Sequence, residues 1–306
     1  MAVNQRVAIV GAGLIGRSWA IVFAGAGFDV ALYDAAAGVA DQACALVTEG
    51  LDELFAHGLV ENAAARVRAA KSVADALDGA GYVQENTPET LPGKRAVFAE
   101  LDRLAAPDAI LASSTSTIVA SLFTQTLKGR ARCLVAHPVN PPHLVPLVEL
   151  VGAPWTSPET IARAKAIHES VGQVPIVVKR EIEGFILNRL QAALLSEAFR
   201  LAGEGYVTPP DLDKTLKDGL GLRWSFMGPF ETIELNAPGG IPDYCRRYGP
   251  SLGRLSGADP AIYQGENLER ILAQWQPLDP DQVAARMRWR DARLVALKAH
   301  KRSQTA

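Results

Sequence analysis

Residues 6–34 read RVAIVGAGLIGRSWAIVFAGAGFDVALYD. The stretch begins with an apolar segment at 6–10 and continues through glycines spaced Gly-x-Gly-x-x-Gly into an apolar-periodic segment at 14–26. It ends with a second apolar segment that closes on Asp34. This order predicts a strand, a tight turn, a helix and a second strand. Because an acid follows the second strand, the stretch indicates a dinucleotide-binding unit rather than a plain tight turn.

Each glycine of this turn has its own physical role. Gly11 allows the tight turn, Gly13 lets the backbone approach a pyrophosphate, and Gly16 lets the helix pack closely on the strand. The start of the helix offers unpaired N–H groups and a partial positive charge to the phosphates. The turn is expected to contact the cofactor through Gly11, Gly13, Leu14, Ile15 and Gly16.

Asp34 distinguishes between two cofactors. It lies 23 residues after Gly11, where its carboxylate can accept hydrogen bonds from an adenosine ribose. A 2′-phosphate would be repelled by that carboxylate and would need an Arg or Lys beside it, but residues 35–37 are all alanine. The sequence therefore predicts NAD rather than NADP.

Composition limits the kind of protein. A chain of 306 residues is long enough for two domains, and 48% hydrophobic with 21% charged residues is typical of a soluble globular protein. The net charge of −2 gives no general attraction to nucleic acid or to an anionic membrane. Three scattered cysteines without a CxxC pattern indicate reduced thiols, not disulfides or a metal site. With no signal peptide or membrane-spanning run, a cytoplasmic location is expected.

The first 180 residues alternate between strand-like and helix-like segments. Such alternation predicts an α/β, Rossmann-like, mostly parallel sheet covered on both faces. The helical segment at 36–57 continues to about residue 70, which suggests a projecting helical hairpin. The expected strands are 6–10, 29–33, 81–85, 109–113, 132–136, 146–151 and 174–178, and the expected helices are 14–26, 36–57, 90–104, 117–124 and 157–171.

The pattern changes after Glu181. Residues 184–203 form one long amphipathic segment, Pro209, Pro210 and Asp211 mark a new helix start, and no strand pattern follows. We therefore expect a sheet domain at 1–181 and an all-helical domain at 182–306. Seven basic residues between 286 and 302 favour a solvated or subunit-facing helix over nucleic-acid binding, because neither aromatic interleaving nor overall basicity supports nucleic-acid binding.

Three polar residues near the late strands are candidates for chemistry. Ser116 follows a predicted strand in SSTST, His137 follows the apolar run CLVA, and Glu149 lies 12 residues later in PLVELV. Ligands of open α/β sheets bind outside the carboxyl ends of the strands. The proline-rich segment between His137 and Glu149 is long enough to reverse direction and place the two side by side. A carboxylate that orients an imidazole suits acid–base chemistry near neutral pH.

Structural interpretations of the same residues remain open at this point. Ser116 or a neighbour can cap a helix that starts near Thr117. A histidine at a strand end is often structural. His143 is a rival base, although no carboxylate partner for it is evident. Glu149 is harder to explain structurally, because an acid within an apolar strand needs a partner.

The motifs GAGLIG, PETLPGK, SSTST, HPVNP, LVELV and GFILNRL together resemble the 3-hydroxyacyl-CoA dehydrogenase superfamily. HPVNPPHLVPLVELV, GFILNRLQAALLSEAFRLAGEG and GLGLRWSFMGPFETIELNAPGG are most similar to its L-gulonate 3-dehydrogenase (lambda-crystallin) branch. The resemblance covers residues 5 to about 250, and more loosely the WRD at 289–291. It implies a helical second domain that forms a homodimer.

The resemblance also implies roles for matching positions. His137 would be the acid–base residue and Glu149 its partner, while Ser116 and Asn188 would hydrogen-bond the reacting oxygen. Asn140 and Ser116 would lie near the nicotinamide. Glu89 and Lys94 would add cofactor contacts to that of Asp34. From the residues alone, Lys94 would be a surface helix lysine and Asn188 a polar helix-face residue.

The distribution of charged residues restricts the class of substrate. No Lys or Arg occurs between Arg17 and Arg66, whereas Asp41, Glu49, Asp52 and Glu53 all lie there, which argues against coenzyme A phosphates at this surface. Arg223 in GLGLRWSFMGP is a candidate to bind a free carboxylate, or else a structural arginine. We therefore expect an NAD-dependent dehydrogenase of a free 3-hydroxy acid, with L-gulonate as the first candidate and no metal. The alternatives are a 3-hydroxyacyl-CoA dehydrogenase, an L-carnitine 3-dehydrogenase, whose aromatic or acidic cage is not evident, and a non-catalytic NAD-binding, crystallin-like protein.

Overall fold

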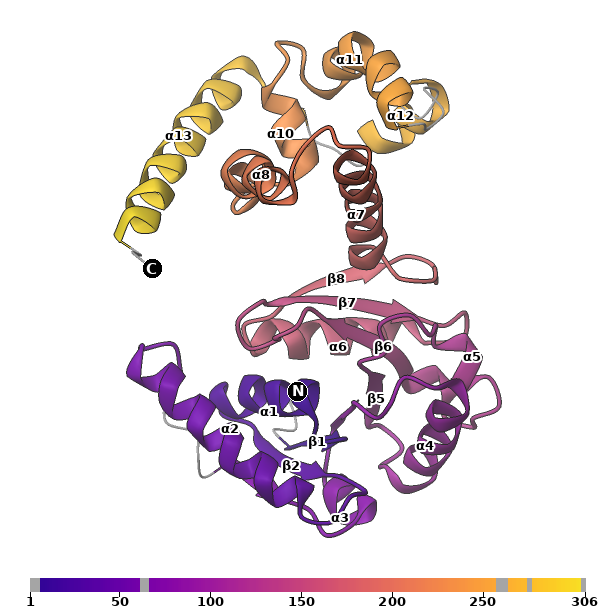
Figure 1. Cartoon of the computed structure of the whole chain (residues 1–306). Coiled ribbons are helices and arrows are strands. Elements are labelled where there is room, and N and C mark those ends of the chain that lie inside the picture. Colours follow the sequence, from indigo (N-terminus) through magenta and orange to yellow (C-terminus); the bar gives the residue numbers. More distant parts are fainter. Residues whose placement is uncertain (1–5, 61–65, 257–263, 274–276, 304–306) are drawn as a thin grey trace. The chain divides into compact units, whose positions relative to one another are not determined.

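The computed structural model describes residues 6–60, 66–256, 264–273 and 277–303. The chain divides into two compact units, residues 1–194 and 195–306, and each is described by itself. The first unit is built on one eight-stranded sheet with helices on both faces (Figure 1). Its strands are β1 Arg6–Val10, β2 Asp29–Tyr33, β3 Val67–Ala69, β4 Tyr82–Glu85, β5 Ile110–Ser113, β6 Cys133–Pro138, β7 Leu147–Gly152 and β8 Val174–Val178.

The strand order of the sheet is β3-β2-β1-β4-β5-β6-β7-β8. All neighbouring strands are parallel except β6 and β7, which are antiparallel. The chain winds outward from β1 in both directions, so the crevice between the ends of β1 and β4 is the place where such sheets bind ligands. The mostly parallel, Rossmann-like sheet predicted from the sequence is confirmed.

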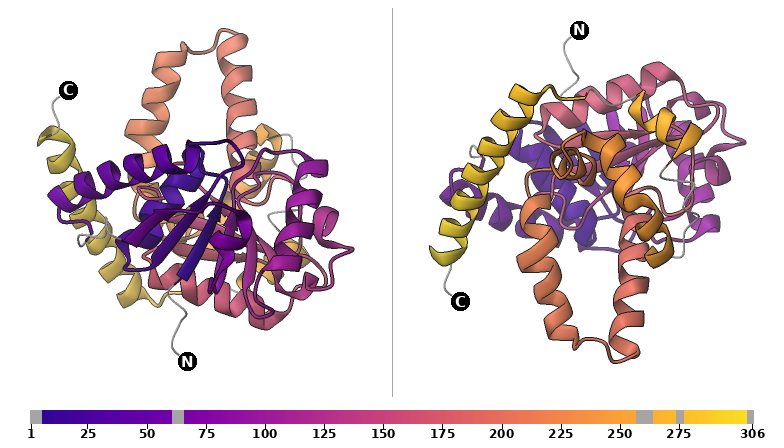
Figure 2. Two further views of the ribbon diagram at one scale, coloured as in Figure 1. Left: turned by 90° about the horizontal axis from the view of Figure 1, so that it is seen from below. Right: turned by 90° about the horizontal axis from the view of Figure 1, so that it is seen from above.

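The sheet is buried on both faces, which explains why its strands are apolar at consecutive positions. All residues of β5 and β6 are buried. One apolar cluster joins the sheet to α1, α2 and α6, and a second cluster joins the other face to α3, α4 and α5 (Figure 2, left). These helices are α1 Leu14–Gly25, α2 Val39–Ala56, α3 Val73–Leu77, α4 Leu91–Leu104, α5 Ser121–Thr124 and α6 Pro158–Ser170, and a 3₁₀ turn covers Arg130–Arg132.

A chain of buried polar groups crosses the α1 and α6 side of the sheet. The Tyr82 hydroxyl lies 2.8 Å from Nε2 of His168 and donates to Gln84. The Gln84 amide donates to the Ser114 hydroxyl, which also accepts from the indole N–H of Trp19. His168 is fully buried, and burial lowers its pKa to about 3. The imidazole is therefore neutral in the folded protein at ordinary pH.

In its described residues the second unit contains helices joined by turns and loops, and it begins within α7. α7 and the segment from α8 to α9 form the two arms of a helical hairpin joined by residues 204–208 (Figure 2). Glu234 is buried and accepts hydrogen bonds from the N–H groups of Ile241 and Leu278, which ties its helix to the following ones. The helices are α7 Leu187–Gly203, α8 Pro209–Thr215, the π-helical turn Leu216–Leu220, α9 Gly221–Trp224, α10 Pro229–Leu235, α11 Gly240–Ser256, α12 Gly265–Leu272 and α13 Pro280–Ser303.

The structure differs from the sequence prediction around α2. The helix ends at Ala56, and residues 67–69 form strand β3 beside β2, so the expected continuation of the helix to about residue 70 is wrong. Residues 61–65, which the predicted hairpin includes, lie outside the described residues. Both β3 and α3 are too short to show a period. The helix expected at 117–124 begins only at Ser121.

Within the residues that the structure describes, no helix is both long and apolar enough to cross a membrane. The basic segment at 286–302 lies on α13. Its Arg286 forms an ion pair with Glu231 and lies 3.5 Å from the ring centroid of Trp289. This arginine is thus part of the packing of the helical unit.

His168 makes the stability of the protein depend on pH. Its pKa is about 3 when folded and about 6.5 when unfolded, so the unfolded chain binds more protons between these values. The free energy of unfolding should therefore fall by up to about 1.4 kcal/mol per pH unit below pH ~6.5 on account of this group. In urea unfolding experiments between pH 7.5 and 4, the free energy of unfolding should fall less steeply with decreasing pH for His168→Leu than for the wild-type protein. Parallel curves for the two proteins would contradict this assignment.

Candidate active site

The glycines after β1 allow close backbone contacts at two positions and leave open space at a third. Gly11 has φ of +93°, and a Cβ there would lie 2.6 Å from the carbonyl oxygen of Asn86. A Cβ at Gly16 would overlap the carbonyl of Gly11, so the helix approaches the turn as closely as the sequence predicts. A Cβ at Gly13 would meet no protein atom within 4 Å. The space above Gly13 is therefore open to a phosphate group.

Asp34 is held beside this turn with its carboxylate ready to accept further hydrogen bonds. Oδ2 accepts from the N–H of Ala12 at 2.9 Å, and Oδ1 accepts from the N–H of Ala36 at 2.9 Å. Each carboxylate oxygen has a second lone pair for a ribose hydroxyl. A cavity of about 480 Å³ lies against Gly11, Gly13 and Asp34. The first turn of α1 contains no acid. These residues fit the adenosine and pyrophosphate of NAD.

His137 and Glu149 form a buried hydrogen-bonded pair. They lie directly opposite each other in the antiparallel β6–β7 ladder, and Nδ1 of His137 is 2.8 Å from Oε2 of Glu149. Burial raises the pKa of Glu149, but hydrogen bonds from His137, Ile186 and Leu187 outweigh burial and leave the pKa below its usual value. Because the ionised carboxylate can only accept, Nδ1 carries the proton and Nε2 has the free lone pair. The predicted juxtaposition is confirmed.

The second oxygen of Glu149 binds the start of a helix. Oε1 accepts hydrogen bonds from the N–H groups of Ile186 at 2.8 Å and Leu187 at 3.1 Å, where α7 begins. The next residue, Asn188, donates from its amide to the backbone carbonyl of Ser116 at 2.9 Å. One carboxylate thus orients the imidazole and anchors the helix end that carries Asn188. The structure brings Ser116, His137, Glu149 and Asn188 into one connected group.

Ser116 lies in a loop that Glu89 organises. Oε1 of Glu89 accepts from the N–H groups of Ser116 and Thr117 and from the hydroxyl of Thr115. The Ser116 hydroxyl itself has no hydrogen-bond partner among the described residues. The helix-capping interpretation of Ser116 is wrong, because α5 begins at Ser121 without a side-chain cap. The neighbouring Thr115 accepts from the N–H of Ile118, so a local turn bond does exist.

Lys94 is buried, and its description as a surface lysine is wrong. Its ammonium group donates to both carboxylate oxygens of Glu85 at 2.9 Å and to the carbonyl of Thr87 at 3.1 Å, and it lies 3.8 Å from Glu89. Glu85 also accepts from the hydroxyl of Ser113. Glu85 was not among the residues predicted from the sequence, although an acid at the end of an apolar strand was a usable signal. The pair joins β4, β5 and α4 beneath the Ser116 loop.

The remaining predicted residues stand apart from this group. Asn140 is exposed in the loop between β6 and β7, before a cis peptide bond to Pro141. His143 is half-buried in the same loop, burial lowers its pKa, and Nδ1 has no partner among the described residues. Within the described part of the chain, no carboxylate is hydrogen-bonded to His143 as Glu149 is to His137. Arg223 lies half-buried in α9 of the helical unit and is not placed with the others.

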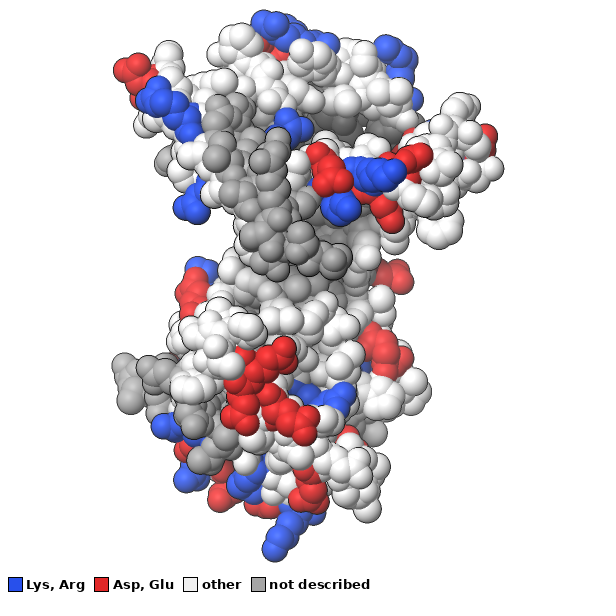
Figure 3. Space-filling model, turned by 60° about the vertical axis from the view of Figure 1, so that its left-hand side comes forward, with Lys and Arg blue, Asp and Glu red and all other residues white. Residues whose placement is uncertain are grey.

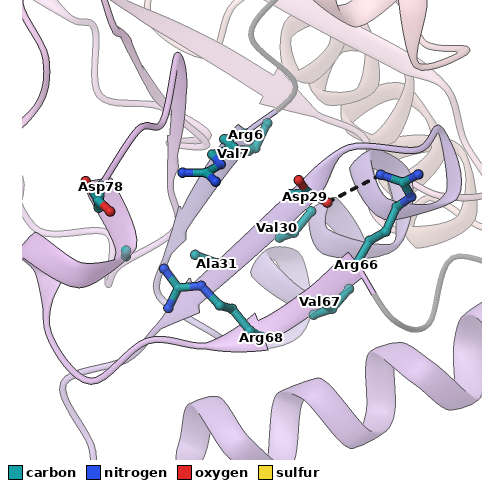
Figure 4. Close-up of a pocket in the computed structure, with 10 residues that line it drawn as sticks. Arg6, Val7, Asp29, Val30, Ala31, Arg66, Val67, Arg68 and Asp78 are labelled. Atoms are coloured by element: carbon teal, nitrogen blue, oxygen red, sulfur yellow. Dashed lines mark hydrogen bonds and ion pairs between the residues drawn. The ribbon is translucent and has the colours of Figure 1, made fainter.

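Another cavity lies at the opposite, amino ends of β1, β2 and β3. It has a volume of about 380 Å³, and Arg66 forms an ion pair with Asp29 at its edge (Figure 4). Arg68 is paired with Asp75. Two of its arginines are thus paired with acids, and none of the candidate catalytic residues lines the cavity. Across the described residues, no cluster of His, Cys, Asp and Glu could hold a metal ion.

The outer surface of the sheet unit is acidic in one region. Figure 3 shows carboxylates gathered on the face of this unit that the view brings forward. The four acids of α2 noted in the sequence are all exposed, and α2 has no basic residue in its last turn. Such a surface repels phosphate groups.

Together, the glycine turn, Asp34 and the His137–Glu149 pair define an NAD-dependent dehydrogenase. The chain belongs to the 3-hydroxyacyl-CoA dehydrogenase family. The NAD binding domain of 3-hydroxyacyl-CoA dehydrogenase matches residues 6–182, and its C-terminal domain matches residues 184–263. The change between the two family domains lies next to the predicted boundary at 181, whereas the compact units divide within α7.

Known proteins are similar to this chain over nearly its whole length. Lambda-crystallin of Oryctolagus cuniculus is 41% identical over 97% of this chain and 96% of its own length. L-carnitine dehydrogenase of Pseudomonas putida is 35% identical over 98% of this chain and 95% of its own length. The crystal structure of a 3-hydroxyacyl-CoA dehydrogenase from Archaeoglobus fulgidus aligns with a TM-score of 0.77 and 26% identity, covering 95% of this chain and 97% of that one.

Asp34 should determine the choice of cofactor. In the double variant Asp34→Ala with Ala35→Arg, a cation replaces the repelling carboxylate, and the ratio of kcat/KM for NADP to that for NAD should rise about a hundredfold. Steady-state kinetics with both cofactors measures the ratio. Asp29→Ala, at the other end of β2, serves as the control and should leave it unchanged. An unaltered ratio in the double variant would mean that another group binds the ribose.

Proposed function

We propose that this protein oxidises the 3-hydroxyl group of a free 3-hydroxy acid with NAD, and that L-gulonate, oxidised to 3-dehydro-L-gulonate, is the first candidate substrate. The observation that carries this proposal is the His137–Glu149 pair, with Nδ1 occupied by the carboxylate and Nε2 free. A base of this kind is what alcohol oxidation requires, since a hydroxyl proton must leave as the hydride departs.

His137 acts as the general base. In the direction of oxidation, Nε2 accepts the proton of the substrate hydroxyl, and Glu149 stabilises the imidazolium that results. The nicotinamide supplies the acceptor for the hydride that leaves the same carbon. In the direction of reduction, the imidazolium returns the proton to the oxygen. Burial of the pair strengthens the interaction between the carboxylate and the charged ring.

Ser116 and Asn188 hold the reacting oxygen. The Ser116 hydroxyl is free of protein partners within the described residues, and the Asn188 amide has one N–H bonded to the Ser116 carbonyl and a second available. Their mutual contact fixes the distance between two donors that approach from β5 and from α7. We propose that these donors stabilise negative charge on the oxygen as the proton is transferred.

On the cofactor side, we propose that the glycine turn and Asp34 bind the adenosine half of NAD, and that Asn140 and Ser116 lie near the nicotinamide. Lys94 has its three protons directed at Glu85 and Thr87, so its contribution is to fix the loop between β4 and α4. Glu89 is partly exposed and is the member of this group that can meet the cofactor directly.

Charge favours a free acid over a coenzyme A thioester. The exposed face of α2 presents carboxylates, so it lacks the cations that the phosphates of coenzyme A need. We propose that Arg223 binds the substrate carboxylate. The proposed homodimer forms through the C-terminal helices from α7 onward, and α7 exposes Leu190 and Phe199 at 64% and 77%. Exposed apolar side chains of this size are typical of an interface.

A panel of hydroxy acids tests the function. L-gulonate, free L-3-hydroxybutyrate, L-3-hydroxybutyryl-CoA and L-carnitine are each incubated with NAD, and NADH formation is followed. A free acid should have a kcat/KM at least about tenfold above that of the thioester. For the best substrate, His137→Asn should lower kcat by about 10²–10⁴-fold while NADH affinity stays within about threefold.

His143→Asn is the matched control for His137→Asn, because it removes the rival imidazole of the next loop, and kcat should be nearly unchanged. A higher kcat/KM for the thioester or for carnitine would show that the proposed substrate class is wrong. Absence of turnover with every compound, despite NADH binding, would favour a non-catalytic NAD-binding protein. Wild-type kcat in His137→Asn would refute the role of the pair.

Arg223 should contribute to substrate affinity. Arg223→Met removes a charge-assisted hydrogen bond, so KM for the free acid should rise about tenfold or more, with kcat and the melting temperature little changed. Arg254→Met, in the same helical unit, is the control and should leave KM unaltered. A lower melting temperature with an unchanged KM would instead show that Arg223 is structural.

A further inference from the structure

The chain takes up an uncommon backbone conformation directly before α7. Gly184 and Phe185 have φ of +73° and +49°. Among the residues that the structure describes, Phe185 is the one non-glycine residue with a positive φ. A bulky side chain is disfavoured in this left-handed region. Strained residues of this kind persist where the surrounding structure holds them, and they gather at functional sites.

The strained turn delivers two N–H groups to one acceptor. After Phe185 the chain turns so that the N–H groups of Ile186 and Leu187 both point at Oε1 of Glu149. The N–H of Phe185 itself donates to the carbonyl of Ile182, and the N–H of Leu190 donates to the carbonyl of Ile186, which starts the helix. Glu149 thus caps α7 from a distant strand, as a carboxylate at a helix N-terminus does.

The same turn places the Phe185 ring against His137. The side chain is fully buried, and its ring centroid lies 5.3 Å from that of the imidazole, with the planes tilted by 49°. Val135 and Val151, which share a strand face with His137 and Glu149, belong to the same apolar cluster as Phe185. The ring therefore packs against the imidazole on the side of the pair that faces this apolar cluster.

We infer that Phe185 is a positioning residue for the His137–Glu149 pair: its ring fixes the imidazole while its left-handed backbone aims two N–H groups at the carboxylate. The inference rests on the proposed function, because it assigns Phe185 to the acid–base pair of that reaction. A side chain that only filled the core would not need the strained backbone. An ordinary backbone would separate the ring from the two N–H groups that hold Glu149.

Two variants remove the ring, one keeping and one relieving the backbone strain, and a third is the control. Phe185→Leu keeps an apolar side chain but loses the ring. Phe185→Gly relieves the backbone strain and also loses the ring. Phe98→Leu makes the same change at another fully buried phenylalanine, which packs on Phe123 in the same cluster, away from the pair. Melting temperatures show how much each substitution disturbs the fold.

The first measurement is steady-state kinetics on the best hydroxy acid. Both Phe185 variants should lower kcat by about tenfold or more, because a small displacement of the base reduces proton transfer. KM and the NADH dissociation constant should stay within about threefold. Phe98→Leu should leave kcat within about twofold of wild type, even if it lowers the melting temperature as much as the Phe185 variants do.

The second measurement does not depend on turnover. Protein labelled with ¹⁵N-histidine should give a low-field signal from the proton on Nδ1 of His137, assigned by its loss in His137→Asn and in Glu149→Gln. The signal should broaden or vanish in both Phe185 variants and persist in Phe98→Leu. An unchanged signal and kcat in Phe185→Leu, or equal kcat losses in Phe185→Leu and Phe98→Leu, would overturn the inference. If no substrate is found, the NMR signal still tests whether Phe185 positions His137. Failure of the proposed function can therefore be distinguished from failure of this inference.

Discussion

The carboxylate of Glu149 is the contact on which the arrangement of the site depends. It is fully buried, and an ionised group in that position is tolerated only when its lone pairs are satisfied. One oxygen accepts from His137, and the other accepts from two backbone N–H groups at the start of α7. The orientation of the base and the location of Asn188 are therefore set by the same anion. Neither can shift without leaving part of a buried charge unpaired.

Two further glutamates organise the neighbouring strand ends in a similar way. Glu85 is bound by Lys94 and Ser113 and joins β4 to β5 and α4, while Glu89 gathers the backbone of residues 115–117. The strand side chains involved, Glu85, Ser113, His137 and Glu149, alternate with residues of the opposite cluster, so all four project from one face of the sheet. The buried Glu85 and Glu149 and the partly exposed Glu89 thus fix three loops of the site by accepting hydrogen bonds from them.

Local patterns were sufficient to predict the dinucleotide turn, the positions of most strands along the chain and the meeting of His137 with Glu149. The glycine spacing and Asp34 are both explained by the binding of a dinucleotide. The proline-rich connection between His137 and Glu149 is long enough for the chain to reverse direction. The burial of Lys94 could not be predicted, because a lysine on an amphipathic helix is indistinguishable from a surface residue until its partner Glu85 is located in space. Phe185 was missed for a related reason, since sequence does not reveal a left-handed φ at a non-glycine residue. The strand β3 has three residues, too few to show an alternation.

The antiparallel ladder between β6 and β7 has a consequence for how the protein can change over time. His137 and Glu149 meet through strand register, and a slip by one position would send them to opposite faces of the sheet. The intervening loop carries none of that constraint. Changes of length between residues 141 and 146 leave this register in place, whereas a single-residue insertion within either strand would separate His137 from Glu149. The loop can therefore diverge among descendants of this chain while the orientation of the base is inherited through the paired strands.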